Sequence, residues 1–361
     1  MKLVVDAAIP CARPYAEQLG RADFLPAAEI TSAAVRDADV LVVRTRTRCD
    51  AALLEGSRVR FIATATIGYD HLDTAYLHRR GIAWTNCPGC NAGSVEQYVH
   101  SALLRLALSG KVRLDVSTTL GIVGVGHVGS RVERMARKMG LSVLLCDPPR
   151  ADRGESGFIP LEDVIRHADI ITFHVPLTRT GRHATYHMAD EPFFRLVAEA
   201  SRHPVIVNTS RGEVVCTESL VRAFDEGVLR AVVVDTWEDE PRISPELLCR
   251  AFLATPHIAG YSADGKARAT QMALAAVARH FGLDRDFAIL PPDLPEGYEY
   301  RPYGFGLLPR EAHHFLSYIP EDAMYAPLRL FDPLCDTFVL RAHPELFEAM
   351  RSHYPLRREF S

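Results

Sequence analysis

The stretch Leu120-Gly-Ile-Val-Gly124-Val-Gly126-His-Val-Gly129 decides the fold. Its first half is a short apolar run typical of a buried strand, and the apolar positions that follow recur at helical spacing. In this strand–turn–helix setting each glycine has its own task. Gly124 permits a tight turn, Gly126 lets the backbone approach a pyrophosphate, and Gly129 lets helix and strand pack closely. The stretch therefore predicts a dinucleotide-binding unit, with the phosphates at the helix N-terminus.

An acidic residue at the end of the next predicted strand indicates which dinucleotide is bound. Asp147 lies 18 residues beyond Gly129, where a carboxylate can accept hydrogen bonds from both hydroxyls of the adenosine ribose. The same carboxylate would repel the 2′-phosphate of NADP, so NAD is the expected cofactor. Arg150 and Arg153 pull weakly the other way, because they would attract that phosphate.

Strand-like apolar runs alternate with amphipathic helical stretches over most of the chain, which is the pattern of an open parallel sheet. We expect strands at 3–5, 39–43, 60–65, 82–85, 120–125, 142–146, 169–173, 204–208 and 230–234. Helices are expected at 92–109, 128–139, 161–167, 191–200, 218–226 and 263–281. The predicted fold class is α/β, and the regular alternation from residue 119 onward predicts a doubly wound domain.

Length and composition exclude several classes of protein. A chain of 361 residues is long enough for two or three domains, and 48% hydrophobic with 24% charged residues is ordinary for a globular protein. With 41 basic and 45 acidic residues there is no basic excess, so we expect no nucleic-acid partner. No apolar run approaches the ~18 residues of a membrane span. Eight cysteines in a chain this long are not a disulfide framework, which favours a reducing, cytoplasmic setting.

The composition changes after Leu290, at Pro291-Pro-Asp-Leu-Pro295. Six of the twelve tyrosines lie beyond this point, which is atypical of a flexible tail. We expect a small packed unit here, and an aromatic-rich terminal unit suits a two-fold interface between subunits.

Three chemically active side chains each follow an apolar run. Arg211 follows the predicted strand at 204–208, Glu240 follows the one at 230–234, and His257 follows a short apolar segment. Ligands of open α/β sheets bind at the carboxyl ends of strands, so these side chains should converge near the cofactor. An arginine fork can hold a substrate carboxylate, and a histidine oriented by a carboxylate can exchange a hydroxyl proton as hydride leaves. Singly each residue is more often structural, but together they favour catalysis.

Two other spacings are not taken as functional sites. Cys87 and Cys90 have the spacing of a redox pair but lie in a predicted loop between a strand and a helix. His183 and His187 have i,i+4 spacing without the glutamate of a zinc protease, and they lie beside a proline-containing loop. We therefore expect neither a metal site nor a redox function.

The glycine loop, Arg211, Glu240 and His257, in this order, resemble the D-isomer-specific 2-hydroxyacid dehydrogenases. The resemblance runs from about residue 36 to 282 and implies that all three side chains are catalytic, with His257 as the acid/base. It also implies two Rossmann-like, doubly wound parallel-sheet domains. The discontinuous substrate domain would comprise residues 1–93 and 258–285, and the NAD-binding domain would comprise residues 94–257. The active-site cleft would lie where the chain crosses from one domain to the other.

The family's other contacts are carried over by position. Contacts to NAD would fall on Gly124, Gly126, His127, Val128, Gly129, Asp147, Val175, Asn208, Thr209, Ser210, Asp235 and Gly260. Contacts to substrate would fall on Thr45, Thr66 and Tyr261. Two residues depart from the family pattern. Thr45 replaces an expected serine and keeps the hydroxyl, whereas Val175 replaces an expected threonine and loses any side-chain hydrogen bond to NAD.

Further motifs look more narrowly like one branch of this family, at residues 88–92, 146–153, 257–261, 326–329 and 357–361. That resemblance implies oxidation of 4-phospho-D-erythronate by NAD to (R)-3-hydroxy-2-oxo-4-phosphobutanoate, a step in pyridoxal 5'-phosphate synthesis. It also implies that residues 290–361 form a small α+β dimerisation domain of a homodimer.

A phosphorylated substrate requires cationic side chains. Arg44, Arg46 and Arg48 end a predicted strand, and alternation would place all three on one face. We expect Arg44 or Arg46 to bind the phosphate, although a solvated sheet edge explains them equally well.

Two alternative functions stay open at this point. One is another dehydrogenase of the same family, such as a phosphoglycerate or glycerate dehydrogenase. The other is a non-catalytic, NAD-sensing binding protein that uses the same fold to recruit partners.

Overall fold

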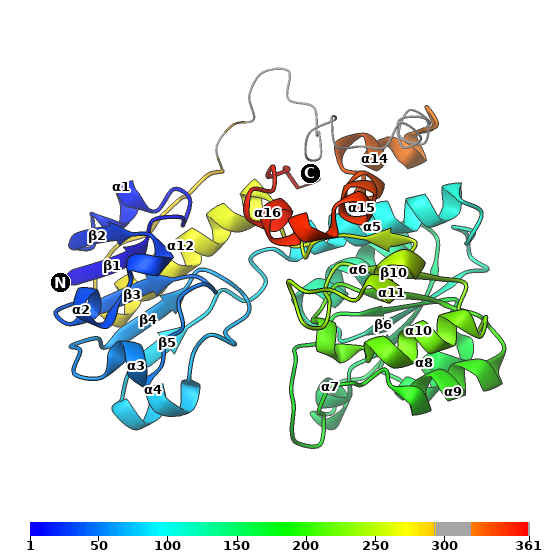
Figure 1. Cartoon of the computed structure of the whole chain (residues 1–361), viewed down its shortest axis with the longest axis horizontal. Coiled ribbons are helices and arrows are strands. Elements are labelled where there is room, and N and C mark those ends of the chain that lie inside the picture. Colours follow the sequence, from blue (N-terminus) through cyan, green and yellow to red (C-terminus); the bar gives the residue numbers. More distant parts are fainter. Residues whose placement is uncertain (292, 294–318, 360–361) are drawn as a thin grey trace. The chain divides into compact units, whose positions relative to one another are not determined.

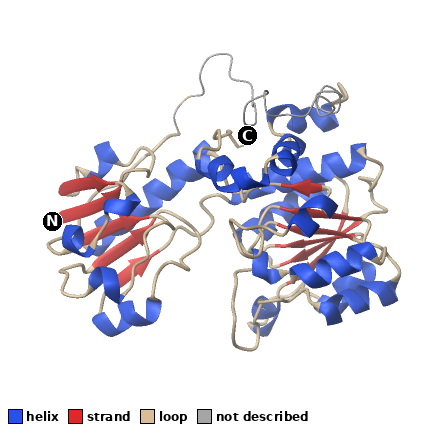
Figure 2. Cartoon of the chain, viewed as in Figure 1, coloured by secondary structure: helices blue, strands red, loops and turns tan. Residues whose placement is uncertain are grey.

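The computed structural model describes residues 1–291, 293 and 319–359. The chain divides into two compact units, residues 1–91 with 262–296 and residues 92–261 with 297–361. Each unit is built on its own parallel sheet (Figures 1 and 2). The loop from His257 to Tyr261 belongs to the second unit, whereas the sequence-based boundary falls directly after His257.

The first unit contains a five-stranded sheet in the order β2-β1-β3-β4-β5. All its strands run parallel: β1 (Lys2–Asp6), β2 (Arg21–Leu25), β3 (Val40–Val43), β4 (Phe61–Thr64) and β5 (Ala83–Thr85). Its helices are α1 (Arg13–Ala16), η1 (Ala27–Glu29), α2 (Ser32–Val35), α3 (Ala51–Leu54), α4 (Thr74–Arg80) and the long α12 (Ala263–His280). Alternate strand residues pack into two cores, since Leu3 and Val5 share one core with α12 and Val4 lies in the other.

The second unit contains a six-stranded parallel sheet in the order β11-β10-β9-β8-β6-β7. Its strands are β6 (Thr119–Val123), β7 (Ser142–Cys146), β8 (Ile170–Phe173), β9 (Val205–Asn208), β10 (Ala231–Val234) and β11 (Leu253–Ala254). Its helices up to β11 are α5 (Ala92–Leu108), α6 (His127–Lys138), α7 (Pro148–Asp152), α8 (Leu161–His167), α9 (Glu191–Ala200), η2 (Gly212–Val214), α10 (Thr217–Asp225) and α11 (Pro245–Arg250). Helices cover both faces of this sheet (Figure 1), so Ile206 packs into one core and Val205 and Val207 into the other.

The strand order of the second sheet reverses at β6. The chain leaves β6 for β7 on one side and then returns to β8 on the other side. Such a switch point leaves a crevice at the carboxyl ends of the two diverging strands, where ligands of doubly wound sheets bind. Gly124 follows β6 and His174 follows β8, so the glycine loop lies at this position.

Only part of the expected α+β domain at 290–361 lies within the described residues, so its α+β character stays a prediction. Its described residues, 319–359, form only helices and no strand: η4 (Ala323–Tyr325), α14 (Ala326–Leu330), α15 (Pro333–Ala342), η5 (Pro344–Leu346) and α16 (Phe347–Ser352). These helices share the cores of the second unit, with Val339, Phe347 and Met350 in one and Phe331 and Tyr354 in the other. The rest of the expected domain, 292, 294–318 and 360–361, lies outside the described residues. Among the described residues, no helix is long and apolar enough to cross a membrane.

Candidate active site

The glycine loop has the geometry of a phosphate cradle. Gly124 has a positive φ of 89°, and a side chain there would collide with the carbonyl of His174. A side chain at Gly129 would collide with the carbonyl of Gly124, so helix and strand meet there without space for a Cβ. By contrast, the position of a Cβ on the exposed Gly126 is open, and no side chain caps the helix that begins at His127. The free N–H groups of this first turn, including Val128, fit a pyrophosphate.

Asp147 ties the glycine loop to the end of β7. Its carboxylate accepts hydrogen bonds from the backbone N–H of Val125 at 2.8 Å and from that of Arg150 at 3.1 Å. The guanidinium groups of Arg150 and Arg153 both bind Glu155, at 2.7 Å and 3.1 Å. Because the single charge of Glu155 offsets part of the positive charge of these two arginines, the weak attraction for a 2′-phosphate expected from them is reduced.

Val175 and His174 border the glycine loop from the end of β8. The Val175 side chain is half-buried, packs against one core and lies where a Cβ on Gly124 would fall. The His174 ring lies between the hydroxyls of Thr172, 3.0 Å from Nε2, and Thr209, 3.3 Å from Nδ1. Burial lowers the pKa of His174 to about 3, so this ring is neutral near neutral pH.

The turn after β9 presents Arg211. The side-chain oxygen of Asn208 accepts hydrogen bonds from the N–H and the hydroxyl of Ser210, and its amide donates to the carbonyl of Arg211 at 2.9 Å. The Arg211 guanidinium donates to the carbonyl of Ser210 at 2.8 Å. Asn208 and Ser210 are buried and shape the turn, whereas Arg211 is half-buried. The sequence pattern placed these residues at a strand end but did not reveal this network.

Asp235 holds the loop that carries His257. One carboxylate oxygen accepts from the N–H of Ile258 at 2.8 Å and the hydroxyl of Thr255 at 2.6 Å, and the other accepts from the N–H of Ala259 at 2.9 Å. Its backbone carbonyl accepts from the N–H of His257 at 2.8 Å. Burial raises the pKa of Asp235, and the hydrogen bonds and His257 oppose that rise. In this structure Asp235 anchors the loop, which continues through the half-buried Gly260.

His257 and Glu240 form a hydrogen-bonded pair. Nδ1 of His257 lies 2.8 Å and 3.0 Å from the two carboxylate oxygens of Glu240. The N–H of Trp237 donates to the same carboxylate at 3.0 Å and helps to fix it. A carboxylate only accepts hydrogen bonds, so Nδ1 carries the hydrogen and Nε2 of the neutral ring is the free proton acceptor. The side chains are 25% and 17% exposed, so solvent screens the pair little.

The ionised form of Glu240 is favoured in this setting. Burial alone would raise the pKa of Glu240, but the charge and hydrogen bond of His257, the Trp237 N–H and Arg351 together lower it. The carboxylate is therefore ionised at neutral pH, where it can stabilise a protonated imidazole.

A residue of the C-terminal helix joins this pair. Nη1 of Arg351, on α16, lies 3.2 Å from a carboxylate oxygen of Glu240, and its Nε lies 3.4 Å from the hydroxyl of Tyr261. The ring of Tyr261 meets that of Tyr354 edge to face, with centroids 6.0 Å apart. Sequence reasoning missed Arg351, because no motif surrounds it and only the folded chain brings it to Glu240.

The first unit carries the residues expected to contact substrate, except Tyr261, which belongs to the second unit. Strand β3 ends at Val43, so Arg44, Arg46 and Arg48 lie in the following loop and strand alternation does not place them on one face, contrary to the expectation. Arg44 forms an ion pair with the buried Asp6 at 3.0 Å, whereas Arg46 is exposed.

Two hydroxyls in the same unit were also expected at the substrate. Thr45 is exposed in the loop after β3. The hydroxyl of Thr66 is 2.7 Å from that of Thr64 and donates to the carbonyl of Gly68 at 2.9 Å. Thr66 thus lies in a fixed turn at the end of β4, while Thr45 is open to solvent.

The motifs that were set aside have local partners. The buried Cys87 thiol donates to the carbonyl of Ala269 at 3.2 Å, and burial raises its pKa. His183 binds Asp152 at 2.8 Å, and His187 binds Glu238 at 2.6 Å. Within the described ranges, no group of three or more potential ligands could hold a metal ion.

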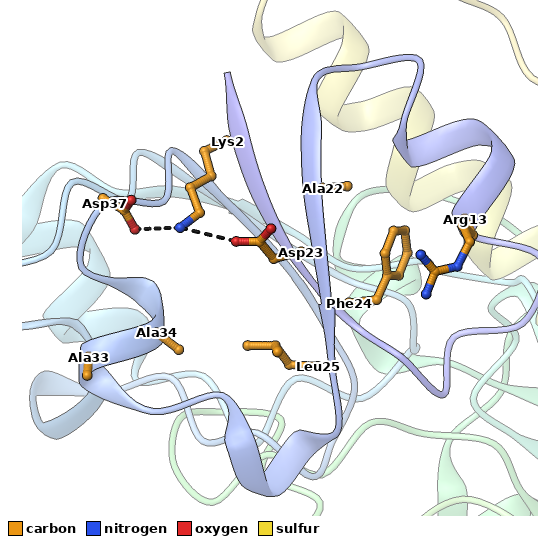
Figure 3. Close-up of a pocket in the computed structure, with 9 residues that line it drawn as sticks. All are labelled: Lys2, Arg13, Ala22, Asp23, Phe24, Leu25, Ala33, Ala34 and Asp37. Carbon is orange, nitrogen blue, oxygen red and sulfur yellow. Dashed lines mark hydrogen bonds and ion pairs between the residues drawn. The ribbon is translucent and has the colours of Figure 1, made fainter.

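A surface cavity of about 470 Å³ lies beside the edge strand β2 (Figure 3). The ammonium group of Lys2 at its wall is held by Asp37 at 2.7 Å and by Asp23 at 3.2 Å. None of the predicted site residues lines it. Its charges neutralise one another, so this cavity is not the candidate active site.

Comparisons with known proteins agree with this fold. A family model described as "D-isomer specific 2-hydroxyacid dehydrogenase, NAD binding domain" matches residues 109–259. The solved D-lactate dehydrogenase from Aquifex aeolicus, complexed with NAD and lactic acid, has a TM-score of 0.64 at 22% identity, covering 78% of this chain and 96% of that one. An NAD-bound 3-phosphoglycerate dehydrogenase from Entamoeba histolytica has a TM-score of 0.65 at 24% identity, covering 78% and 95%. The fold and the matched family model thus define an NAD-binding dehydrogenase of 2-hydroxy acids, and the expectation of NAD is confirmed.

Curated relatives match nearly the whole chain. Proteins named erythronate-4-phosphate dehydrogenase are 47% identical over 361 residues in Bacteroides fragilis, covering 99% of this chain and 97% of that protein. The corresponding protein of Porphyromonas gingivalis is 43% identical over 363 residues, covering 99% and 94%. That of Yersinia pestis is 41% identical over 367 residues, covering 100% and 93%. The chain therefore belongs to the D-isomer-specific 2-hydroxyacid dehydrogenases and, within them, to the erythronate-4-phosphate dehydrogenase family.

Proposed function

We propose that this enzyme oxidises 4-phospho-D-erythronate with NAD to (R)-3-hydroxy-2-oxo-4-phosphobutanoate, in the synthesis of pyridoxal 5'-phosphate. The observation that carries the reaction type is the contact of 2.8 Å between His257 Nδ1 and Glu240, at the carboxyl ends of strands of an NAD-binding sheet. The choice of substrate rests on the relatives named erythronate-4-phosphate dehydrogenase, which match nearly the full length of the chain.

The side chains divide the reaction between them. Arg211 binds the substrate carboxylate and polarises the carbon that becomes a ketone. Nε2 of His257 accepts the proton of the 2-hydroxyl group, and Glu240 stabilises the imidazolium that results. Bound NAD supplies the acceptor for the hydride from carbon 2. The hydroxyl has then lost a proton and its carbon a hydride, which leaves the keto acid.

Other contacts are proposals at the level of single residues. Thr45, Thr66 and Tyr261 contact the substrate, and Arg44 or Arg46 binds its 4-phosphate. The contacts to NAD come from the glycine loop, from Asp147 at the ribose, and from the ends of β8, β9 and β10. Val175 contributes apolar packing only, since it has no hydroxyl.

The setting and the assembly are proposals as well. We propose that the enzyme works in the cytoplasm, because all eight cysteines are free thiols. We further propose that it is a homodimer whose interface is formed by the segment from residue 290 onward, the part of the chain richest in tyrosine.

A single-turnover assay tests the function. Enzyme in excess over 4-phosphoerythronate is mixed with NAD, and NADH absorbance is followed; 3-phosphoglycerate and glycerate are tested in parallel. This format avoids masking by slow release of NADH. His257→Ala serves as the control for chemistry, since it should bind NAD yet reduce it slower by a factor of about 10² to 10⁴.

The outcomes separate the candidate functions. Rapid reduction with 4-phosphoerythronate and not with the other two acids supports the proposal. Reduction with another acid keeps the mechanism and refutes the substrate. No reduction with any of the three, in protein that binds NAD, points to an NAD-sensing binding protein instead.

A further inference from the structure

The C-terminal helix α16 brings a cation to the proposed catalytic pair. Arg351 donates to Glu240 at 3.2 Å and to the hydroxyl of Tyr261 at 3.4 Å. Its side chain is 21% exposed and that of Glu240 is 17% exposed, so the ion pair is shielded from bulk water. One guanidinium group thus fixes the side chains at the two ends of the segment from Glu240 to Tyr261, which includes α11 and β11.

The carboxylate of Glu240 is shared between two partners. It binds His257 Nδ1 at 2.8 Å through the same oxygen that contacts Arg351. The charged and titratable groups around His257 include Glu240 and Asp235 from the chain after β10, Tyr261 from its own loop and Arg351 from α16. The two carboxylates favour a protonated ring, and Arg351 is the cation among these groups that opposes it.

We propose that Arg351 is a positioning residue of the dehydrogenase reaction. It holds the carboxylate of Glu240 and the hydroxyl of Tyr261 in place, and its charge keeps the neutral, proton-accepting form of His257 populated to lower pH. The C-terminal helix is then part of the catalytic apparatus. This inference rests on the proposed role of His257 as the base.

The test compares three arginine variants through the pH dependence of kcat/KM for oxidation. Arg351→Met should lower the rate and move the acidic limb of the profile upward by roughly half a pH unit to one unit, because the protonated ring is no longer opposed. Arg351→Lys keeps the charge and should keep the limb in place, with a lower rate from the lost fork geometry. Arg341→Met is the matched control from the same segment, since Arg341 donates instead to the carbonyls of Leu248 and Ala251.

Reduction of the keto acid supplies a second readout, because it needs protonated His257. In Arg351→Met the alkaline limb of this reverse reaction should also move upward. A limb that stays in place in Arg351→Met, or that moves equally in Arg341→Met, overturns the proposal. Loss of NADH binding in Arg351→Met would also overturn it, because the arginine would then hold the fold rather than the pair. If the wild-type enzyme lacks an acidic limb, or if His257→Ala keeps full activity, the proposed role of His257 itself is wrong, independently of Arg351.

Discussion

At the scale of single residues, Arg44 and Arg46 illustrate how neighbours in one loop acquire different roles. Arg44 neutralises Asp6, whose side chain is fully buried. Burial lowers the pKa of Lys266 to about 8, and the positive charge of Arg44 lowers it further. Arg46 is exposed in the turn after β3. Removing Arg44 therefore disturbs the fold of the first unit, whereas the exposed Arg46 is the better placed of the two to meet a ligand.

The 4-phosphate provides the test for these arginines. Arg46→Ala should raise KM for 4-phosphoerythronate by about 5- to 150-fold, the equivalent of ~1–3 kcal/mol for a charge-assisted contact. Arg44→Ala should lower the stability of the first unit, because it leaves the Asp6 carboxylate buried and unpaired. Arg48→Ala is the control, since Arg48 is 79% exposed and pairs with Asp50. Initial rates at varied substrate measure KM, and an unchanged KM in both test variants rules out either arginine as the phosphate ligand.

At the scale of elements, the end of β8 contains a histidine that the fold keeps neutral. The His174 ring sits between the hydroxyls of Thr172 and Thr209, and burial lowers its pKa to about 3 from an ordinary 6.5. Below pH 6.5 the unfolded chain binds a proton at this position that the folded chain does not bind until about pH 3. The free energy of unfolding should therefore fall as the pH drops through this window, and His174 should have no such effect above it.

Replacement of His174 by asparagine tests this. One such group changes the free energy of unfolding by at most about 1.4 kcal/mol per pH unit. His174→Asn should remove most of this pH dependence. Urea unfolding is followed by tryptophan fluorescence in a Trp84→Phe background, so that the buried Trp237 reports the second unit alone. Burial also lowers the pKa of His71 in the first unit, to about 4. Because Trp237 reports the second unit alone, the titration of His71 does not enter the measured pH dependence. An equal pH dependence of the unfolding free energy in the Trp84→Phe protein with and without His174→Asn would show that His174 does not titrate as described.

Most strands of the described chain were predictable from the sequence, whereas many short helices were not, and the exceptions have physical reasons. Strands such as β9 are buried on both faces, so each reads as a continuous apolar run with sharp ends. The missed strand β2 is an edge strand with the sequence Arg-Ala-Asp-Phe-Leu, which has no fully buried residue. The missed β11 has only two residues. Helices α14 and α16 have five and six residues, too few to display a helical period.

The candidate site was predictable where its residues are close in sequence to a strand end. Arg211, Glu240 and His257 each follow an apolar run, and the rule for parallel sheets brings such positions together. Arg351 lies 111 residues beyond Glu240, in a segment whose packing no local pattern reveals. Arg357 was noticed only for its resemblance to a family ending, and its contacts become visible only in the fold.

At the scale of the whole molecule, the C-terminal segment completes the second unit. Arg357 is 1% exposed and donates to the carbonyls of Ile258 and Ala259, at 3.2 Å and 2.7 Å, and to the side chain of Gln97 at 2.9 Å. Its guanidinium also stacks 4.0 Å from the ring centre of Phe331. One buried cation thus links α5, the loop that follows His257 and the end of the chain. Folding of this segment and formation of the catalytic loop should therefore be coupled.

A buried ion pair between α5 and the C-terminal segment makes this coupling measurable. Arg105 on α5 binds Asp332, which precedes α15, through two hydrogen bonds, and both side chains are 5% exposed. Arg105→Ala leaves the Asp332 carboxylate buried without its partner, so the second unit should lose about 3–5 kcal/mol of stability. Urea unfolding followed by Trp237 in the Trp84→Phe background measures the loss.

Two further variants separate this ion pair from general effects of losing an arginine. Arg113→Ala removes an arginine that is 84% exposed and paired with Asp115, and it should cost no more than about 1 kcal/mol. Arg105→Met combined with Asp332→Asn removes both charges and should recover part of the stability lost in Arg105→Ala, because no unpaired charge stays buried. If Arg105→Ala costs no more than Arg113→Ala, the ion pair between Arg105 and Asp332 does not hold the C-terminal segment to the second unit. If Arg105→Ala lowers the stability of the second unit by an intermediate amount and the double variant recovers part of this loss, the segment is held to α5 by charge as well as by its apolar core.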